Sequence, residues 1–571
     1  MNRSKYAIGA AVLLTLVAIG RVVRTYPDTA QAFDEPCHVS AAIELLDKGS
    51  YTLDPKNAPL ARYAIGLPMY LAGLRYPPLS AGDPKSHNYN NVGNIILGQG
   101  GHYMHNLLLA RSGILIFLVL AAAVVFFWAR RLCGDFAGVV AVGLLTTTPT
   151  VLAFSSVAYS DMAAAFAQTL ALFAFVNWLD HATNKTSTWL GFTIALALLA
   201  KFTSLVYLPV AMALILASRW SMQRDQPPAS PSVPWGRQIT LALVIVLLVW
   251  WAGYRFTFGR LQIAKLSTAT FQHFPAPVRP MVRRIALLNP PLPAPDLFYG
   301  LAESYVFNKE KPISYLFGIT KKGGWWFFFF IELVVKSPPA LLLLSSVGLV
   351  ALVPVIRQRK WQPLAPAISA IAILLSTTTT NVYYGIRHII VLFPLLAIVG
   401  GCGAVGLWGL EGKWRVPGRA AVIAVLTVQV VSTMAARRDY LAYFNALAGS
   451  DPSRILVLGC DLDCGQDLFR LSRALHARGI EHFNLAVWSS ADIDRGQLPS
   501  YTLPKPYEPV TGWFAISVRA RRLGDVLLLR KRTYPPGSFE WLDQYQPVEH
   551  IGKTISLYYI PDKTDDTYTS P

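Results

Sequence analysis

Long runs of apolar residues separated by short basic segments occupy most of this chain. A run of about 20 apolar residues is long enough to cross the hydrocarbon core of a membrane as a helix. The pattern therefore predicts a polytopic helical membrane protein. We expect membrane-spanning helices in eleven ranges, which are 6–23, 107–129, 136–154, 161–179, 188–200, 203–218, 239–254, 330–356, 362–378, 386–409 and 418–436.

Lys and Arg in the short connecting loops predict the orientation of these spans, because cytoplasmic loops are enriched in basic residues. A cytoplasmic N-terminus places five basic loops on the inside with it, near residues 130–131, 185, 219–237, 357–360 and 413–419. This arrangement requires 189–220 to be a hairpin of two short spans that turns near Lys201. The alternative is a single tilted span, which would reverse the predicted side of the membrane for every later loop.

Three larger pieces are then expected outside the membrane. The first loop, 24–105, contains two amphipathic stretches, VSAAIELLDKG and APLARYAIGLPMYLAGL, which we interpret as helices along the interface. The second piece is 255–325. The tail, 437–571, contains the strand-like runs ILVLG, WFAISV and DVLLLR and the helical stretch DLFRLSRALHARG. We therefore divide the chain into a transmembrane module, 1–436, and a small soluble α/β domain, 437–571.

Composition supports a membrane protein, since 53% of the residues are hydrophobic and mean hydropathy is +0.39. The net charge of +19 is interpreted as loop bias and contact with anionic lipid, because no basic–aromatic nucleic-acid module is found. Cys460 and Cys464 are close enough in sequence to form a disulfide, although spacing alone leaves this open. Cys37 and His38 lack a second pair of ligands, so no metal site is predicted.

The stretch FDEPCH follows the first span and places Asp34 and Glu35 at the membrane surface. A carboxylate sheltered by interfacial helices suits a general base. A solvated acid pair is the alternative. His38 lies one helical turn beyond Asp34 and is expected to bind substrate or only to form structural hydrogen bonds.

Four further positions carry charge where apolar residues dominate. Asp161 begins the fourth span, where an acid also favours a helix N-terminus. Lys201 lies inside the apolar hairpin, where an ammonium needs an anion or an outward path. Lys336 has Glu332 one turn before it, so a structural ion pair is the alternative to a binding role.

Arg387 and His388 begin a later span in NVYYGIRHII. A guanidinium matches phosphate oxygens well. An acid pair and several cations at one membrane face fit a base that acts opposite a phosphate leaving group. They also fit a lipid or anion transporter, but no half-repeat of the kind common in transporters is found.

Seven short motifs occur in an order that resembles a known family. They are FDEPCH, APLA, YSD, LLAKFTS, the stretch from Trp325 to Pro338, GIRHIIVLFP, and YFN, and LDCGQDLFRL in the tail adds to them. The chain resembles bacterial phospholipid-carrier-dependent glycosyltransferases. These are relatives of the protein O-mannosyltransferases and of the lipid A aminoarabinose transferase in the C-type membrane glycosyltransferase superfamily. Cys464, where the family usually has Trp, and Ala58, where it often has Pro, depart from the pattern.

The resemblance implies about 11–13 transmembrane helices, large extracytoplasmic loops, and a location in the bacterial inner membrane. It implies a polyprenyl-phosphate-linked sugar as donor and an inverting transfer outside the cytoplasm, with Asp34 as catalytic base. We expect Glu35 and Asp161 to assist catalysis. We expect the following residues to bind substrate: His38, Lys201, Lys336, Arg387 and His388. No cofactor or metal is predicted, and the sugar and its acceptor (protein, lipid or polysaccharide) are left open.

Overall fold

A computed structural model describes residues 2–79, 88–224, 235–261, 272, 274, 276–493, 497–526, 532–533, 535 and 537–562. Eight helices in the described part of the chain are long and apolar enough to cross a membrane, and Leu392–Trp408 is a shorter apolar helix. The expectation of a polytopic helical fold is confirmed. The eight segments are Ser4–Val23, Tyr103–Thr146, Asp161–Asp180, Ser204–Gln223, Trp235–Gly253, Pro339–Arg357, Gln362–Thr379 and Gly412–Ala435.

Two of the predicted spans share one long element. The runs 107–129 and 136–154 fall largely on α6 (Leu115–Thr146), which breaks at Gly134 with φ 85° and ψ −178°. That backbone conformation is open almost only to glycine, so the chain can turn there between two helical segments. The end of the second run forms a separate helix, α7 (Pro149–Ser155).

The predicted span 330–356 is wrong at its start. The chain forms α15 (Phe328–Lys336) and then α16 (Pro339–Arg357), with an extended Ser337 between them. Pro338 and Pro339 explain the break, because proline lacks an amide hydrogen and disfavours helix in the residue before it.

The hairpin predicted around Lys201 is confirmed as two separate helices, α9 (Asn184–Ala200) and α10 (Ser204–Gln223). Lys201 itself is extended, with φ −161° and ψ 137°. It therefore lies at a break between helices, where its side chain can turn toward another segment.

The helix α18 (Leu392–Trp408) lies at the centre of the bundle and contacts both α6 and α16. Glycines allow this close packing: a Cβ on Gly403 would lie 2.3 Å from the Leu344 carbonyl oxygen, and one on Gly401 would lie 2.6 Å from that of Ala137. Close approach of small residues is typical of helices packed inside membranes. The remaining helices of the bundle are α1 (Asn2–Val23), α8 (Asp161–Asp180), α11 (Trp235–Gly253), α17 (Ala365–Ser376) and α19 (Arg415–Ala435).

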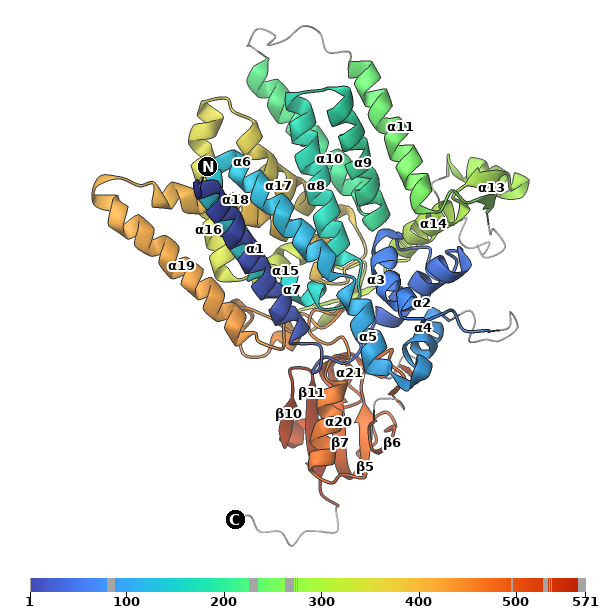
Figure 1. Ribbon diagram of the computed structural model, residues 1–571. Coiled ribbons are helices and arrows are strands. Elements are labelled where there is room, and N and C mark those ends of the chain that lie inside the picture. Colours follow the sequence, from blue (N-terminus) through green and yellow to red (C-terminus); the bar gives the residue numbers. More distant parts are fainter. Residues whose placement is uncertain are drawn as a thin grey trace.

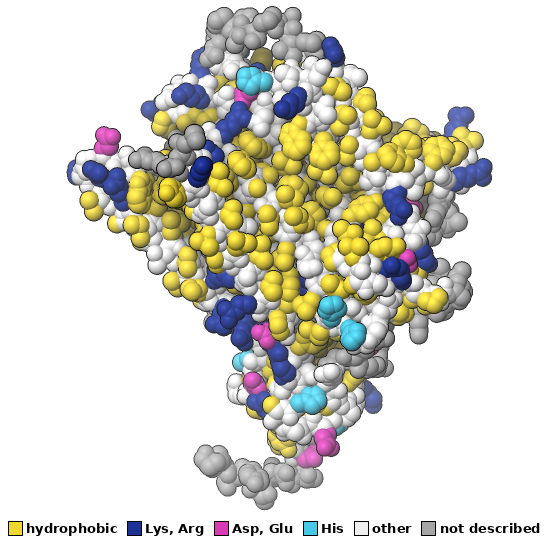
Figure 2. All heavy atoms as spheres, viewed as in Figure 1, with side chains coloured by type: hydrophobic (Ala, Val, Ile, Leu, Met, Phe, Trp, Pro, Cys, Tyr) yellow, Lys and Arg dark blue, Asp and Glu magenta, His cyan; other side chains and the backbone are white. Residues whose placement is uncertain are grey.

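The surface agrees with a membrane location. Figure 2 shows a broad band of hydrophobic side chains across the helices, with Lys and Arg mostly at its borders. The N-terminus and the C-terminal sheet lie at opposite ends of the bundle (Figure 1).

The first outer segment forms four short helices and one π-helical turn. Its two amphipathic stretches are helical, as predicted. The elements are α2 (Glu35–Ile43), the turn Glu44–Lys48, α3 (Leu60–Leu71), α4 (Tyr89–Leu97) and α5 (Tyr103–Ser112). The second outer segment contributes α13 (Arg279–Leu288), α14 (Pro295–Lys309) and two small hairpins, β1 (Phe258–Arg260) with β2 (Pro291–Pro293) and β3 (Ile313–Leu316) with β4 (Ile319–Lys322).

The tail forms a five-stranded sheet in the order β10-β11-β7-β5-β6. The strands are β5 (His482–Ala486), β6 (Ser500–Thr502), β7 (Gly512–Ser517), β10 (Glu549–Ile551) and β11 (Ile555–Ile560). The strand β5 is parallel to β6 and β7, and the other pairs are antiparallel. The helices α20 (Leu468–Ala477) and α21 (Val518–Leu523) complete this part of the chain, so the predicted small α/β domain is present.

One of the three predicted strands of the tail is wrong, and another is only partly within the described residues. WFAISV lies in β7, but ILVLG is an irregular segment whose Val457 and Leu458 pack against Tyr315. Of DVLLLR, only Asp525–Val526 is strand, as β8, which pairs with β9 (Arg532–Thr533); the rest lies outside the described residues.

The irregular segment before α20 is pressed against the loop that precedes α18. Gly459 has φ 74°, and a Cβ there would lie 2.2 Å from the backbone carbon of Tyr384. A side chain at 459 would therefore separate the tail from the membrane helices. The backbones of Gly459 and Tyr384 lie directly against each other at this contact.

We predict that Gly459→Ala destabilises the protein more than Gly449→Ala. Gly449 has nearly the same φ, 73°, but a Cβ there meets nothing within 4 Å. Both variants place a side chain at a positive φ, and only Gly459→Ala also adds the close contact, which we expect to cost about 1–3 kcal/mol. Thermal unfolding in nanodiscs, followed by tryptophan fluorescence, measures it. Equal unfolding temperatures would contradict the packing described here.

Candidate functional site

Asp34 and Arg387 are 353 positions apart in sequence and form an ion pair. Asp34 is the N-cap residue of α2, and Arg387 lies on a 3₁₀ turn, Ile386–Ile389, directly before α18. Their side chains are 26% and 19% exposed. The pair is therefore largely sheltered but still open to a ligand.

Asp161 and Lys201 extend this pair into a network of four alternating charges. The Lys201 ammonium donates to Asp161 at 2.6 Å and to the main-chain oxygen of Arg387 at 3.2 Å. The Arg387 Nε lies 3.9 Å from Asp161 Oδ2. Four of the predicted residues thus meet at one place, and their formal charges cancel. Asp161 is paired with a cation rather than acting only at the helix end.

Tyr159 is a member of this site that the sequence analysis missed. Its hydroxyl oxygen accepts a hydrogen bond of 2.8 Å from the Asp34 amide. The Arg387 guanidinium lies 5.2 Å from the centre of its ring, within the range of a cation–π contact. Tyr159 is fully buried. The only signal in the sequence is its place two residues before Asp161.

Glu35 is directed away from the network and into a fully buried ion pair with Arg111. Its carboxylate accepts from Arg111 at 2.7 and 2.8 Å and from the amides of Ala32 and Ala158. Arg111 also donates to the carbonyls of Thr29 and Ala30. Glu35 and Arg111 therefore fix the backbone before Asp34 and tie it to the segment at Ala158. The solvated acid pair considered for Asp34 and Glu35 is not what the structure shows.

The two predicted histidines flank the network. The His38 ring is 5.2 Å from that of Tyr159, and its Nδ1 is buried without a partner among the described residues. The carbonyl of His388 accepts from Tyr207 at 3.2 Å. Burial and the positive charges of Lys201 and Arg387 lower the pKa of the His388 ring well below its ordinary value, so this imidazole is neutral.

Lys336 does not reach the four-charge network. Its ammonium donates to the carbonyls of Leu441 and Asp461. No ion pair joins it to Glu332 within the described chain; the fully buried Glu332 carboxylate instead faces the carboxylate of Asp461. Asp461 in turn accepts a 3.0 Å bond from the Ile386 amide. Lys336 therefore contacts the segment that holds the turn carrying Arg387.

Cys460 and Cys464 form a disulfide, which the sequence had left open. The Tyr159 hydroxyl lies 3.3 Å from the sulfur of Cys464 and 3.6 Å from that of Cys460. The Cys464 carbonyl accepts a 3.0 Å bond from the Phe33 amide. The position where Cys464 departs from the family pattern is thus in direct contact with the site.

A cavity of about 660 Å³ lies between the first outer segment and α14, and Lys56 is in its wall. None of the four charged residues lines it. Desolvation lowers the pKa of Lys56, but the negative charges of Asp54 and Asp34 outweigh it and raise this pKa above its ordinary value. Lys56 makes no ion pair within 4.0 Å in the described part of the chain. It is a second functional candidate that the sequence analysis missed.

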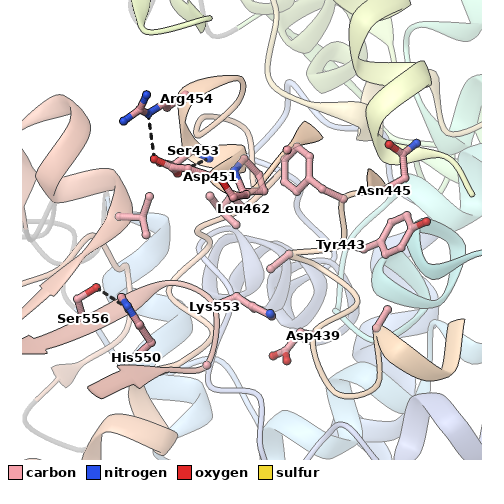
Figure 3. A pocket seen from close by; sticks show the side chains of 18 of the residues that line it. Asp439, Tyr443, Asn445, Asp451, Ser453, Arg454, Leu462, His550, Lys553 and Ser556 are labelled. Carbon is pink, nitrogen blue, oxygen red and sulfur yellow. Dashed lines mark hydrogen bonds and ion pairs between the residues drawn. The ribbon is translucent and has the colours of Figure 1, made fainter. Parts of the chain in front are cut away.

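A larger cavity, about 1080 Å³, lies between the end of α19 and the C-terminal sheet. Figure 3 shows Asp439, Tyr443 and Lys553 around it, with an ion pair between Arg454 and Asp451 at one side. None of the eight predicted site residues lines it. A search of the described residues finds no cluster of three or more His, Cys, Asp or Glu side chains that could hold a metal ion.

Fold and site together define a multi-pass membrane protein with a charged cluster at one end of its helices. Residues 104–251 match the family model described as dolichyl-phosphate-mannose-protein mannosyltransferase. This segment, about a quarter of the chain, includes Tyr159, Asp161 and Lys201. The resemblance to the mannosyltransferase relatives inferred from the motifs is thereby confirmed.

Solved structures with similarity to the chain include ArnT and AglB. ArnT from Cupriavidus metallidurans bound to undecaprenyl phosphate is 12% identical, with a TM-score of 0.46, over 96% of this chain and 98% of that one. The oligosaccharyltransferase AglB from Archaeoglobus fulgidus, in complex with an inhibitory peptide and a dolichol-phosphate, is also 12% identical. Its TM-score is 0.49, over 98% of this chain and 74% of that one. A sequence comparison with curated proteins gives no match.

We predict that Glu35→Gln destabilises the protein strongly, by about 3–5 kcal/mol, because it leaves the buried Arg111 charge without its partner. Asp34→Asn is the matched control, since Asp34 is partly exposed and its partner Arg387 keeps Asp161 nearby. We expect Asp34→Asn to shift unfolding much less. Thermal unfolding of both variants in nanodiscs checks the difference. If the two shifts are equal, Glu35 does not hold the loop as described.

Proposed function

We propose that this protein is a membrane glycosyltransferase that moves a sugar from a polyprenyl-phosphate carrier to an acceptor hydroxyl. The observation that carries the proposal is the pairing of a half-sheltered carboxylate, Asp34, with the guanidinium of Arg387. The match of residues 104–251 to a family named for a lipid-phosphate-linked sugar donor supports the substrate class. The reaction needs a base for the acceptor and a cation for the leaving phosphate, and these are the two groups that meet here.

Asp34 acts as the general base. It takes the proton from the acceptor hydroxyl while that oxygen attacks the anomeric carbon. The bond between the anomeric carbon and the phosphate oxygen breaks on the opposite face, and its electrons stay on the phosphate. One displacement of this kind inverts the configuration at carbon. Tyr159 and Glu35 are positioning residues, because they bind the backbone around Asp34.

Arg387 has a different role before and after the donor binds. Its guanidinium is bound to Asp34 and lies 3.9 Å from Asp161. A carrier phosphate competes for the same guanidinium, since planar N–H donors suit phosphate oxygens. This exchange frees the Asp34 carboxylate for the acceptor, so base activation is linked to donor binding. Lys201 supplies a second positive charge, and Asp161 holds both cations in place.

The proposal assigns no metal or cofactor, because Arg387 and Lys201 supply the positive charge that the leaving phosphate needs. Lys336 supports the site indirectly through Asp461 and the turn at Ile386. The identity of the sugar and of its acceptor is left open here. We place the site on the extracytoplasmic face of a bacterial inner membrane, following the positive-inside pattern of the loops.

The topology prediction is that a phosphatase reporter fused after Asp451 is active and one fused after Arg415 is inactive. The phosphatase reporter folds only outside the cytoplasm, and the basic loops predict that residue 415 lies inside. Reporter activity in whole cells, corrected for fusion abundance, measures it. The reverse pattern would place Asp34 and Arg387 in the cytoplasm and contradict the proposed carrier orientation.

The catalytic prediction concerns Asp34→Asn, which keeps the size of the side chain but removes the base. We expect turnover to fall by about 10²–10⁴-fold while donor binding is kept or becomes tighter, because the Asp34 charge no longer competes with the phosphate for Arg387. Transfer from a purified polyprenyl-phosphate sugar in nanodiscs measures turnover, and direct binding of the same lipid measures affinity. If Asp34→Asn retains near-normal turnover, the base lies elsewhere.

Arg387→Ala is expected to impair donor binding as well as transfer, unlike Asp34→Asn. It should weaken donor binding by about 1.5–3 kcal/mol and also slow transfer, because the phosphate gains charge as its bond to the sugar breaks. Arg387→Lys should recover little, since a single ammonium does not replace the planar fork. Normal donor binding by Arg387→Ala would contradict the phosphate role.

A further inference from the structure

The cavity that contains Lys56 in its wall is built by two segments that are far apart in sequence. The first outer segment contributes residues 44–56, with Tyr76 and Tyr89, and α14 contributes Tyr299 and Glu303. Its volume of about 660 Å³ is in the range of small-molecule sites, about 300–1,000 Å³.

Helix α14 is fixed against the first segment by a backbone contact. A Cβ on Gly300 would lie 1.9 Å from the Pro55 carbonyl oxygen, so a larger residue would push the helix away. Ser304 donates a 3.2 Å hydrogen bond to the carbonyl of Lys56. Tyr299 and Glu303 are therefore held in the wall that Lys56 shares, rather than on a free loop.

Two carboxylates in this wall can each accept a further hydrogen bond from a ligand. The Glu303 Oε1 accepts from the Tyr299 hydroxyl at 3.0 Å, and within the described chain no donor reaches Oε2. The Asp54 Oδ2 accepts from Arg62 and Asn57. The Asp54 Oδ1 is buried and has no hydrogen-bond partner among the described residues. A buried acceptor without a partner is costly unless a ligand supplies the donor.

Aromatic faces and ammonium groups complete the lining. The Lys56 ammonium is 5.5 Å from the centre of the Tyr89 ring, and that of Lys48 is 3.4 Å from the centre of the Tyr76 ring. Such a wall offers acceptors for hydroxyl hydrogens, donors for hydroxyl and ring oxygens, and flat surfaces for C–H faces. These are the needs of a sugar ring, whereas a polyprenyl chain needs an apolar lining.

We propose that this cavity is the subsite for the sugar of the carrier-linked donor, with Glu303 and Tyr299 as specificity-determining residues. The inference rests on the proposed glycosyltransferase function and assigns the sugar to these residues. Lys56 joins the subsite to the reaction centre, because it lies within the electrostatic range of Asp34.

The test compares binding of short-chain polyprenyl-phosphate mannose, glucose and galactose with binding of the bare polyprenyl phosphate, in nanodiscs. We expect the wild type to bind at least one sugar-loaded carrier more tightly than the bare carrier. Glu303→Gln should weaken that loaded carrier about tenfold and leave the bare carrier unchanged, because only the sugar hydroxyls contact Glu303. Tyr299→Phe should show the same selective loss to a smaller degree.

Glu310→Gln is the matched control, since Glu310 follows the last turn of the same helix, is exposed and does not line the cavity. It should bind both kinds of carrier as the wild type does. The subsite is wrong if the wild type binds no loaded carrier more tightly than the bare one, or if Glu303→Gln weakens both equally. Binding is measured without turnover, so these outcomes are separate from a failure of Asp34 as the base.

Discussion

The rest of the site depends on how four charges are neutralised at the edge of a membrane domain. Asp34, Arg387, Asp161 and Lys201 come from four different segments, and each cation lies beside a carboxylate. Removing a charge from water is costly, so each of these groups requires its partner to be in place. The first outer segment, the start of α8, the α9–α10 junction and the turn before α18 are therefore held in one arrangement.

Much of the architecture follows from simple sequence signals. Apolar length predicts the membrane helices, and Lys201 within an apolar stretch marks the break between α9 and α10. The same reasoning brings Asp34, Asp161, Lys201 and Arg387 to one face, because a buried charge needs a counter-charge. The break before α16 was missed, although two prolines mark it, because hydropathy averaged over a window passes across them.

Other features depend on contacts that hydropathy and spacing do not encode. Glu35 is next to Asp34 in sequence, yet it faces the opposite way and pairs with Arg111, 76 positions away. Lys336 binds two backbone carbonyls instead of the nearby Glu332. Tyr159 and Lys56 carry no unusual local pattern, and their importance comes from what the fold places beside them. ILVLG has strand-forming residues but packs as an irregular segment, because its backbone is in contact with the loop before α18.

The contacts between the two ends of the chain determine when this site can exist. Ser490 donates to the carbonyl of Phe33 across 457 positions, and the Ala30 amide donates to the carbonyl of Gln466. Synthesis proceeds from the N-terminus, so Asp34 emerges early and waits for partners made much later. A ribosome-bound chain that ends before the sheet therefore has the four charged residues but lacks the contacts that hold Ala30 and Phe33. The segment that carries Asp34 is fixed only after the last part of the chain has been made and has docked.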